Sequence, residues 1–256
     1  MPEKENAMKN TQIFLTPNEG KQLIADALAS LDFVQEAMRE HTVVVVMGTT
    51  NAYLANALLS QLGEEEIDMK GFHRGITKPG SVDMKVPAQQ YDLVIEKGKV
   101  IPEKTIFDVA GALTKDDVIF KGANAVHISS ETAGVLIGHP AGGTVLACEQ
   151  AAVGKRTTFI MPVGVEKRVE LPISDLASFV NDCDSEGLRL YPATGTPYTE
   201  LDALTDLFDV DAELIAAGGI CGAEGGCWFQ CEGAGEDIDS LVEYVKELKE
   251  LPAFEV

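Results

Sequence analysis

Two segments of this chain contain side chains that suit the binding of a small anion. Lys121-Gly122-Ala123-Asn124 follows the apolar run Val118 to Phe120, and Ala141-Gly142-Gly143-Thr144 precedes the helical run Val145 to Val153. Lysine and asparagine side chains donate hydrogen bonds, and the first N–H groups of a helix carry partial positive charge. In open α/β sheets, ligands bind at the carboxyl ends of the strands. We therefore expect a carboxylate or a phosphate to bind here.

A basic pair lies at the exit of the next strand. That strand is predicted over Thr157 to Met161, and Lys167 and Arg168 follow it. Because the parallel strands of a sheet end at one edge, Lys121, Lys167 and Arg168 are expected to share one rim. Lys155-Arg156 precedes the strand instead, which is typical of a solvated surface pair.

An earlier loop has the same organisation. Val43 to Val46 is continuously apolar, which is typical of a buried parallel strand. Gly48-Thr49-Thr50-Asn51 follows it, and a helix is predicted over Ala52 to Leu62. Thr50 or Asn51 is expected either to cap this helix or to use its side chain on a bound anion. A cap without a ligand is the alternative.

The order of apolar runs indicates the fold class. Strands and helices alternate to about Val169, which predicts an α/β protein with a Rossmann-like, mainly parallel sheet and helices on both faces. The pattern changes after this point. We expect residues 1–169 to form the Rossmann-like domain and residues 170–256 to form a small α+β, ferredoxin-like subdomain or lid.

Local signals predict further elements. Thr16-Pro17-Asn18-Glu19 supplies an N-cap, a proline at the first helical position and a capping-box glutamate for a helix that runs to about Glu40. Asp92 to Ile95 and Lys99 to Ile101 are predicted to form a hairpin. Additional helices are expected near 174–180, over 200–208 and over 238–248. Additional strands are expected near 188–191, 214–217 and 228–230, with a glycine-rich tip over 218–226.

The formal net charge of −21 on 256 residues limits the partners. Residues 199–256 carry 15 acidic residues against Lys246 and Lys249. Nucleic acid is not an expected partner, because its phosphate backbone requires a basic face. A locally basic pocket for one small anion is compatible with this charge. The charged N-terminus and the lack of a run of about 18 apolar residues predict a cytoplasmic protein without a membrane segment.

The five cysteines lack the paired spacing of a zinc ribbon. Cys227 and Cys231 lie on one face of a predicted strand and Cys221 could oppose them, so a three-thiolate metal or iron–sulfur site is one alternative. Buried free thiols are favoured instead. No other spacing indicates a metal site, and we expect neither a metal nor a cofactor.

These segments together resemble the superfamily of ribose-5-phosphate isomerase A, glucosamine-6-phosphate deaminase and the CoA transferases, and they resemble the isomerases most clearly. Gly48 to Asn51 is similar to the loop that binds the substrate phosphate in that family. Gly122 to Asn124 and Ala141 to Thr144 are similar to two further motifs. The resemblance implies a general-base role for Glu149 and a substrate-binding role for Lys167.

The chain departs from the family at three positions. Lys121 and Asn124 stand where the isomerases have an aspartate pair, and Pro140 stands where they have a catalytic lysine. The resemblance implies the catalytic candidates Glu149, Lys121 and Asn124. The candidate substrate-binding residues are Gly48, Thr49, Thr50, Asn51, Gly122, Gly142, Gly143, Thr144 and Lys167. The resemblance to this superfamily also implies that the chain forms a homodimer or a homotetramer.

Three functions are open at this point. In the first, Glu149 moves a proton on a small anionic, phosphorylated metabolite, as in an isomerase, while Lys121 and Lys167 stabilise the oxyanion. In the second, the pocket belongs to a non-catalytic metabolite-binding or regulatory protein. In the third, the chain is an acyl or CoA transferase-like enzyme with Glu149 or Glu131 as nucleophile. The structural alternative for Glu149 is a helix-surface carboxylate, and three histidines are interpreted as loop or capping residues: His73, His127 and His139.

Overall fold

The computed structural model describes residues 7–74 and 88–251. Its largest sheet has six strands in the order β10-β8-β5-β2-β3-β4. Four strands, from β10 to β2, run parallel, and β3 and β4 are antiparallel additions. The bounds are β2 Thr42–Val45, β3 Leu93–Glu96, β4 Lys99–Val100, β5 Val118–Phe120, β8 Thr158–Pro162 and β10 Thr196–Tyr198.

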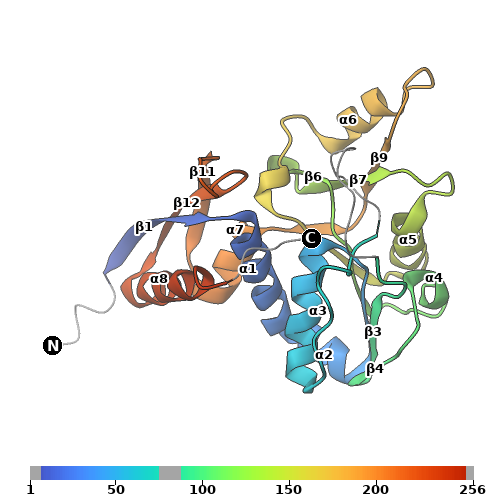
Figure 1. Cartoon of the computed structure of the whole chain (residues 1–256), viewed down its shortest axis with the longest axis horizontal. Coiled ribbons are helices and arrows are strands. Elements are labelled where there is room, and N and C mark those ends of the chain that lie inside the picture. The colour runs from blue at the N-terminus through green and yellow to red at the C-terminus, as the bar shows by residue number, and fades with distance from the viewer. Residues whose placement is uncertain (1–6, 75–87, 252–256) are drawn as a thin grey trace.

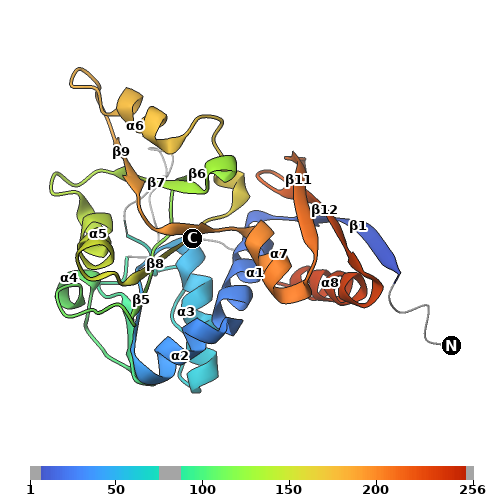
Figure 2. The ribbon, with the colours of Figure 1, turned by 180° about the vertical axis from the view of Figure 1, so that it is seen from behind.

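Helices cover both faces of this sheet. On one face lie α1 (Pro17–Ser30), α2 (Asp32–Glu40) and α3 (Thr49–Leu62), and on the other lie α4 (Ile106–Val109) and α5 (Gly143–Lys155). Figure 2 shows β5 and β8 between these two groups. Alternate residues of β2 enter the two apolar cores, because successive side chains of a strand point to opposite faces. A continuous valine run therefore fits a strand that is buried on both sides.

A three-stranded antiparallel sheet lies beside the main sheet and has the order β1-β12-β11. Its strands are β1 (Met8–Leu15), β11 (Asp211–Ala217) and β12 (Cys227–Ala234), and α8 (Gly235–Leu248) packs against β1 and β12 (Figure 1). The helix α7 (Glu200–Phe208) contacts β11 on one side and α1 on the other. The first and last strands of the described chain are thus paired.

A second antiparallel sheet has the order β6-β7-β9. It consists of β6 (Ala125–His127), β7 (Thr132–Ile137) and β9 (Arg189–Ala193), with α6 (Ile173–Val180) packed against it. Two 3-10 turns complete the path, η1 (Ile128–Ser130) after β6 and η2 (Val165–Lys167) after β8. In Figure 2 this sheet lies above the parallel strands β5 and β8, on the side of the edge where a ligand was expected.

Many predicted elements are confirmed. β5 ends at Phe120 as predicted, the bounds of α7 agree with the prediction, and the hairpin of β3 and β4 forms as expected. The capping box is also present, since Thr16 Oγ1 accepts from Glu19 N at 3.4 Å and Glu19 Oε2 accepts from Thr16 N at 2.7 Å. The coarse prediction of a mixed α/β fold with a mostly parallel sheet is therefore confirmed.

Three details of the prediction are corrected. The helix predicted from Thr16 to Glu40 is divided at Leu31, whose extended backbone (φ −64°, ψ 132°) separates α1 from α2. Neither Thr50 nor Asn51 caps α3, because the helix begins at Thr49 with Gly48 as its N-cap. The strands β1, β6, β7 and β10 were not predicted.

All three sheets combine strands from before and after the predicted domain boundary at 169/170. β1 comes from the first predicted domain and pairs with β12 over its whole length. In the other direction, β10 joins the edge of the six-stranded sheet through β8.

No helix in the described ranges is long and apolar enough to cross a membrane.

Candidate functional site

A pocket of about 720 Å³ lies where β5, β7 and the start of α5 meet. Its lining combines basic, polar and apolar residues from several segments. They are Arg74, Phe107, Lys121, Asn124, Val135, Leu136, Ile137, Gly138, His139, Pro140, Ala141, Gly142, Gly143, Thr144, Val145 and Leu188. Five predicted site residues are thereby brought together: Lys121, Asn124, Gly142, Gly143 and Thr144.

Among the described residues that line this pocket, Lys121 and Arg74 are the lysine and arginine side chains. Its backbone N–H continues the ladder of the sheet by donating to Ile160 O at 3.1 Å, which fixes the residue at the end of β5. Its Nζ donates to Gly122 O at 3.3 Å. Burial lowers the pKa of the Lys121 amine, and the nearby charges of Lys167 and Arg74 lower it further, whereas Cys148 and Asp92 act in the opposite direction.

Arg74 is the second cation. Its Nη2 lies 3.5 Å from Asp92 Oδ1 and donates to Gln90 O at 3.2 Å, while its Cζ lies 5.9 Å from the centre of the Phe107 ring. The Asp92 side chain is fully buried, so breaking its contacts would leave a buried charge without a partner, which costs free energy. The guanidinium is thus held at the pocket by a carboxylate, a carbonyl and an aromatic face.

Asp92 also connects two loops under the pocket. Its Oδ1 accepts from Met47 N at 3.0 Å and its Oδ2 accepts from Ile106 N at 2.7 Å. Burial raises the pKa of the Asp92 carboxyl, and the two backbone donors and Arg74 oppose that rise. This aspartate therefore joins the end of β2 to the start of α4 and orients Arg74.

The N-terminus of α5 forms the opposite wall. Gly142 and Gly143 have φ values of +79° and +66°, which favour glycine, and they turn the chain into the helix. Gly142 N donates to His139 O at 3.0 Å, and Ala141 N donates to His139 Nδ1 at 3.1 Å. A helix of 13 residues presents its first N–H groups and the positive end of its dipole at this point.

Asn124 lines the pocket but is partly used by the fold. Its Oδ1 accepts from Leu136 N at 3.0 Å, and its backbone N–H donates to Gly134 O at 2.9 Å. These bonds pin the start of β6 to β7. The carboxamide nitrogen is the part of this side chain that remains to act as a donor to a ligand.

Glu149 does not line the pocket. The carboxylate is buried, with Oε1 accepting from Thr194 N at 2.8 Å and Oε2 accepting from Thr194 Oγ1 at 2.6 Å. Thr194 lies in the turn between β9 and β10. The observed contacts of Glu149 therefore tie α5 to this turn, and its predicted role as a base stays a prediction.

The loop Gly48 to Asn51 also lies outside the pocket. The side chains of Thr50 and Asn51 are buried in α3. Asn51 Nδ2 donates to Val46 O at 2.7 Å and to Phe120 O at 3.0 Å, so this amide joins the carboxyl ends of β2 and β5. The described structure thus gives Asn51 a structural contact, and the anion-binding role predicted for the loop stays a prediction.

Lys167 belongs to a separate ionic cluster at the same edge of the sheet. Its Nζ lies 3.9 Å from Glu166 Oε1. Glu200 is buried beside this pair and its Oε2 accepts from Val165 N at 2.8 Å. Burial raises the pKa of Glu200 to about 8, with a further contribution from the charge of Glu166. The charges of Lys167 and Glu200 both act on Lys21 of α1, so the cluster joins α1, η2 and α7.

Neither Glu131 nor His127 lines the pocket. Glu131 is exposed in the turn between β6 and β7, with φ +49°. His127 Nδ1 lies 2.6 Å from Ser130 Oγ and faces a second hollow of about 440 Å³, which Arg168 also lines. His73 is buried, and its ring nitrogens have no hydrogen-bond partner in the structure as described.

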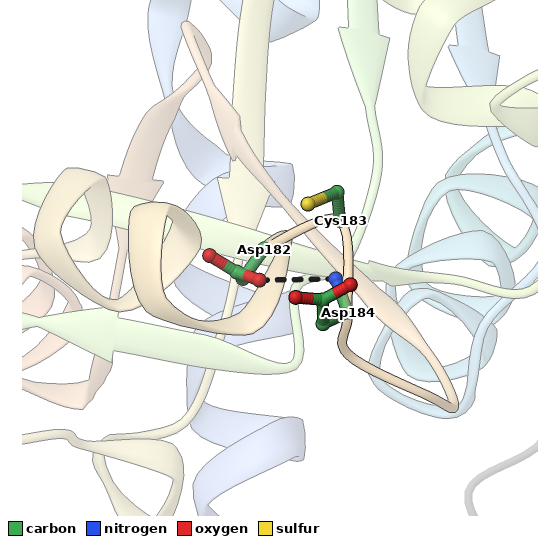
Figure 3. A group of neighbouring side chains, drawn as sticks. All are labelled: Asp182, Cys183 and Asp184. Atoms are coloured by element: carbon green, nitrogen blue, oxygen red, sulfur yellow. Dashed lines mark hydrogen bonds between the residues drawn. The ribbon is translucent and has the colours of Figure 1, made fainter.

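Potential metal ligands gather at one place among the described residues, the turn after α6. Asp182, Cys183 and Asp184 are consecutive and exposed, with ligand atoms within 4.8 Å of one another. Asp184 N donates to Asp182 Oδ1 at 3.0 Å, as the dashed line in Figure 3 shows. This bond accounts for the turn, and we assign no ion to it. Cys227 and Cys231 are buried free thiols, as predicted, and Cys221 is exposed.

Sequence reasoning did not include Arg74, Phe107 or Leu188 in the site. Arg74 belongs to a basic stretch whose later residues, 75–87, lie outside the described ranges. The basic residues around Arg74 can be seen in the sequence. That Arg74 lies in the same pocket as Lys121 depends on the path of the chain. Phe107 and Leu188 follow no motif, and they reach the pocket from α4 and from the segment before β9.

Comparisons with protein-family models, with curated proteins and with solved structures found no match for this chain.

Proposed function

We propose that this protein binds a small anionic metabolite in the pocket of Lys121, Arg74 and the N-terminus of α5. The observation that carries the proposal is the convergence of two cationic side chains and a helix N-terminus on one pocket in a chain of net charge −21. Asp92 offsets part of the positive charge, because it pairs with Arg74. Lys121 and the N-terminus of α5 still leave a local positive charge that favours an anion.

The composition of the walls narrows the class of metabolite. Val135, Leu136, Ile137 and Leu188 supply aliphatic surface, and Phe107 supplies an aromatic ring. A pocket with mainly apolar walls and a few convergent polar groups is typical of a small-molecule site. The ligand that fits is therefore an organic carboxylate or phosphate with a carbon chain, in preference to an inorganic ion.

A Rossmann-like arrangement and a relationship to the sugar-phosphate isomerases remain parts of this proposal. The four parallel strands and the position of the pocket at their carboxyl edge support them. The residues that line the pocket support a binding function. Proton transfer by Glu149 would require its carboxylate to leave Thr194, and we therefore do not include it in the proposal.

Isothermal titration calorimetry with inorganic phosphate and with glyoxylate tests the proposal. Lys121→Met and Arg74→Gln each remove one cation from the pocket and should each weaken binding by about tenfold or more, the equivalent of about 1.4 kcal/mol. The matched control is Lys115→Met. It removes the same charge from an exposed side chain that does not line the pocket.

Two results would contradict the proposal. One is equal affinity in the wild type, Lys121→Met and Arg74→Gln, which would place any anion elsewhere. The other is equal weakening by Lys115→Met, which would show that only net charge matters. Thermal melting of each variant checks that the fold is retained.

A further inference from the structure

Lys121 is partly buried, and its amine has few hydrogen-bond partners. Among the described residues, the acceptor that its Nζ contacts is the backbone oxygen of Gly122. The charge of Asp92 acts on Lys121, but its carboxylate already accepts from two backbone N–H groups and pairs with Arg74. A buried ammonium without its own carboxylate is costly, whereas a neutral amine is not.

The neighbouring cations act in the same direction as burial. Lys167 and Arg74 both repel a proton on Lys121, and together with burial they lower the pKa of this amine. The neutral fraction near pH 7 is therefore larger than that of an exposed lysine, whose pKa is about 10.4. A neutral amine is the form that attacks carbonyl carbon.

We propose that the Lys121 amine forms an imine with an aldehyde or ketone that also carries a carboxylate or phosphate group. Nζ attacks the carbonyl carbon, and a C–N bond forms as the carbonyl π bond opens. The carbinolamine then loses its oxygen as water, which takes both protons of the original amine. The step needs no oxidant or reductant, and it rests on the anion site proposed above.

The pocket supplies what this step requires besides the amine. Arg74 and the N-terminus of α5 hold the anionic group, which limits the positions of the carbonyl carbon relative to Lys121. The apolar walls, including Phe107 and Leu136, supply a surface on which the carbon chain of the substrate packs. The substrate class is therefore a small oxo acid or a phosphorylated carbonyl compound.

Reductive trapping tests this inference on the full-length wild-type protein. Glyoxylate, glycolaldehyde phosphate and uncharged glycolaldehyde are each incubated with the protein and sodium cyanoborohydride, and the adducts are mapped by peptide mass spectrometry. Lys115 and Lys246 serve as internal references, because their side chains are exposed. We expect the anionic probes to label Lys121 at least tenfold faster than either reference at pH 7, and excess phosphate to slow the labelling of Lys121 alone.

The pH profile and one variant complete the test. Labelling of Lys121 should reach its half-maximal rate at a lower pH than labelling of Lys115. Lys121→Arg keeps the charge but has no nucleophilic amine, so its labelling at this position should be lost while its thermal melting reports on the fold.

The outcomes separate the two proposals. Binding of glyoxylate in the calorimeter without an adduct on Lys121 overturns the imine and leaves the anion site standing. Labelling of Lys121 by uncharged glycolaldehyde as fast as by glyoxylate also overturns the inference as stated, because the anion would then contribute nothing. If the anionic probes neither bind in the calorimeter nor label Lys121, both proposals are overturned.

Discussion

Glu149 and Thr194 are joined by two hydrogen bonds, one from the backbone N–H and one from the hydroxyl of Thr194, at 2.8 and 2.6 Å. This double contact fastens α5 to the turn between β9 and β10. Because the N-terminus of α5 lines the pocket, the same contact fixes one wall of the proposed anion site. Glu149, which was predicted to act as a base, thus makes a structural contact between α5 and this turn.

Loss of the Glu149–Thr194 contact should destabilise the fold. Thr194→Val removes the hydroxyl donor and leaves the backbone bond, so we expect the free energy of unfolding to fall by about 1–2 kcal/mol. Glu149→Ala should cost more, since both hydrogen bonds are lost and a buried side chain is truncated. Urea unfolding measures both, with Glu64→Gln as an exposed charge control. A Glu149→Ala variant as stable as the wild type would show that this contact contributes nothing to stability.

Two glycines of the α5 segment should respond to alanine in opposite directions. Gly142 has φ +79°, and a Cβ there would collide with the Leu146 side chain. Gly142→Ala should therefore cost about 1 kcal/mol and weaken anion binding, because it disturbs the helix N-terminus. Gly154 lies inside α5 with open space around it, so Gly154→Ala should stabilise by about 0.5–1 kcal/mol. Thermal melting compares the two, and equal signs would contradict the prediction.

Glu200 should make stability depend on pH. Burial raises its pKa from 4.5 in the unfolded chain to about 8, so the native state keeps a proton that the unfolded chain releases. The free energy of unfolding therefore falls as the pH rises through this window. Glu200→Gln keeps an acceptor for Val165 N and cannot ionise. Relative to the wild type, its free energy of unfolding should rise by about 3–4 kcal/mol between pH 5 and pH 8.

The control for this prediction is Glu65→Gln, which removes an exposed carboxylate. Its unfolding free energy should follow that of the wild type across the same pH range. Parallel pH profiles for Glu200→Gln and the wild type would mean that Glu200 is ionised in the native state at all pH values tested.

Tyr244 connects α8 to α1 through Asp26. The Tyr244 hydroxyl donates to Asp26 Oδ2 at 2.6 Å, while Gln22 Nε2 donates to the other carboxylate oxygen at 2.8 Å. Tyr244→Phe removes one donor from a part-buried carboxylate, and we expect a loss of about 1–2 kcal/mol in urea unfolding. Tyr91→Phe is the matched control because Tyr91 is 41% exposed. Equal effects of the two substitutions would refute the role given to this bond.

Local sequence signals account for much of the fold. The bounds of β5 and α7 follow from an apolar run and from a capping threonine at position 199, and both depend on neighbours within a few residues. The same is true of the capping box at Thr16 and of the glycine turn before α5. These features were predictable because their energies come from adjacent backbone groups and from the alternation of apolar residues.

Contacts between distant segments account for the rest. β1 pairs with β12 across more than two hundred residues, and no local pattern specifies a strand partner so far along the chain. Arg74 and Lys121 line one pocket because Asp92, the carbonyl of Gln90 and the ring of Phe107 hold Arg74 there. The sequence also left the direction of the Glu149 carboxylate open. Helical periodicity fixes its position on α5, but the path of the β9–β10 turn supplies Thr194, the partner that a buried carboxylate requires.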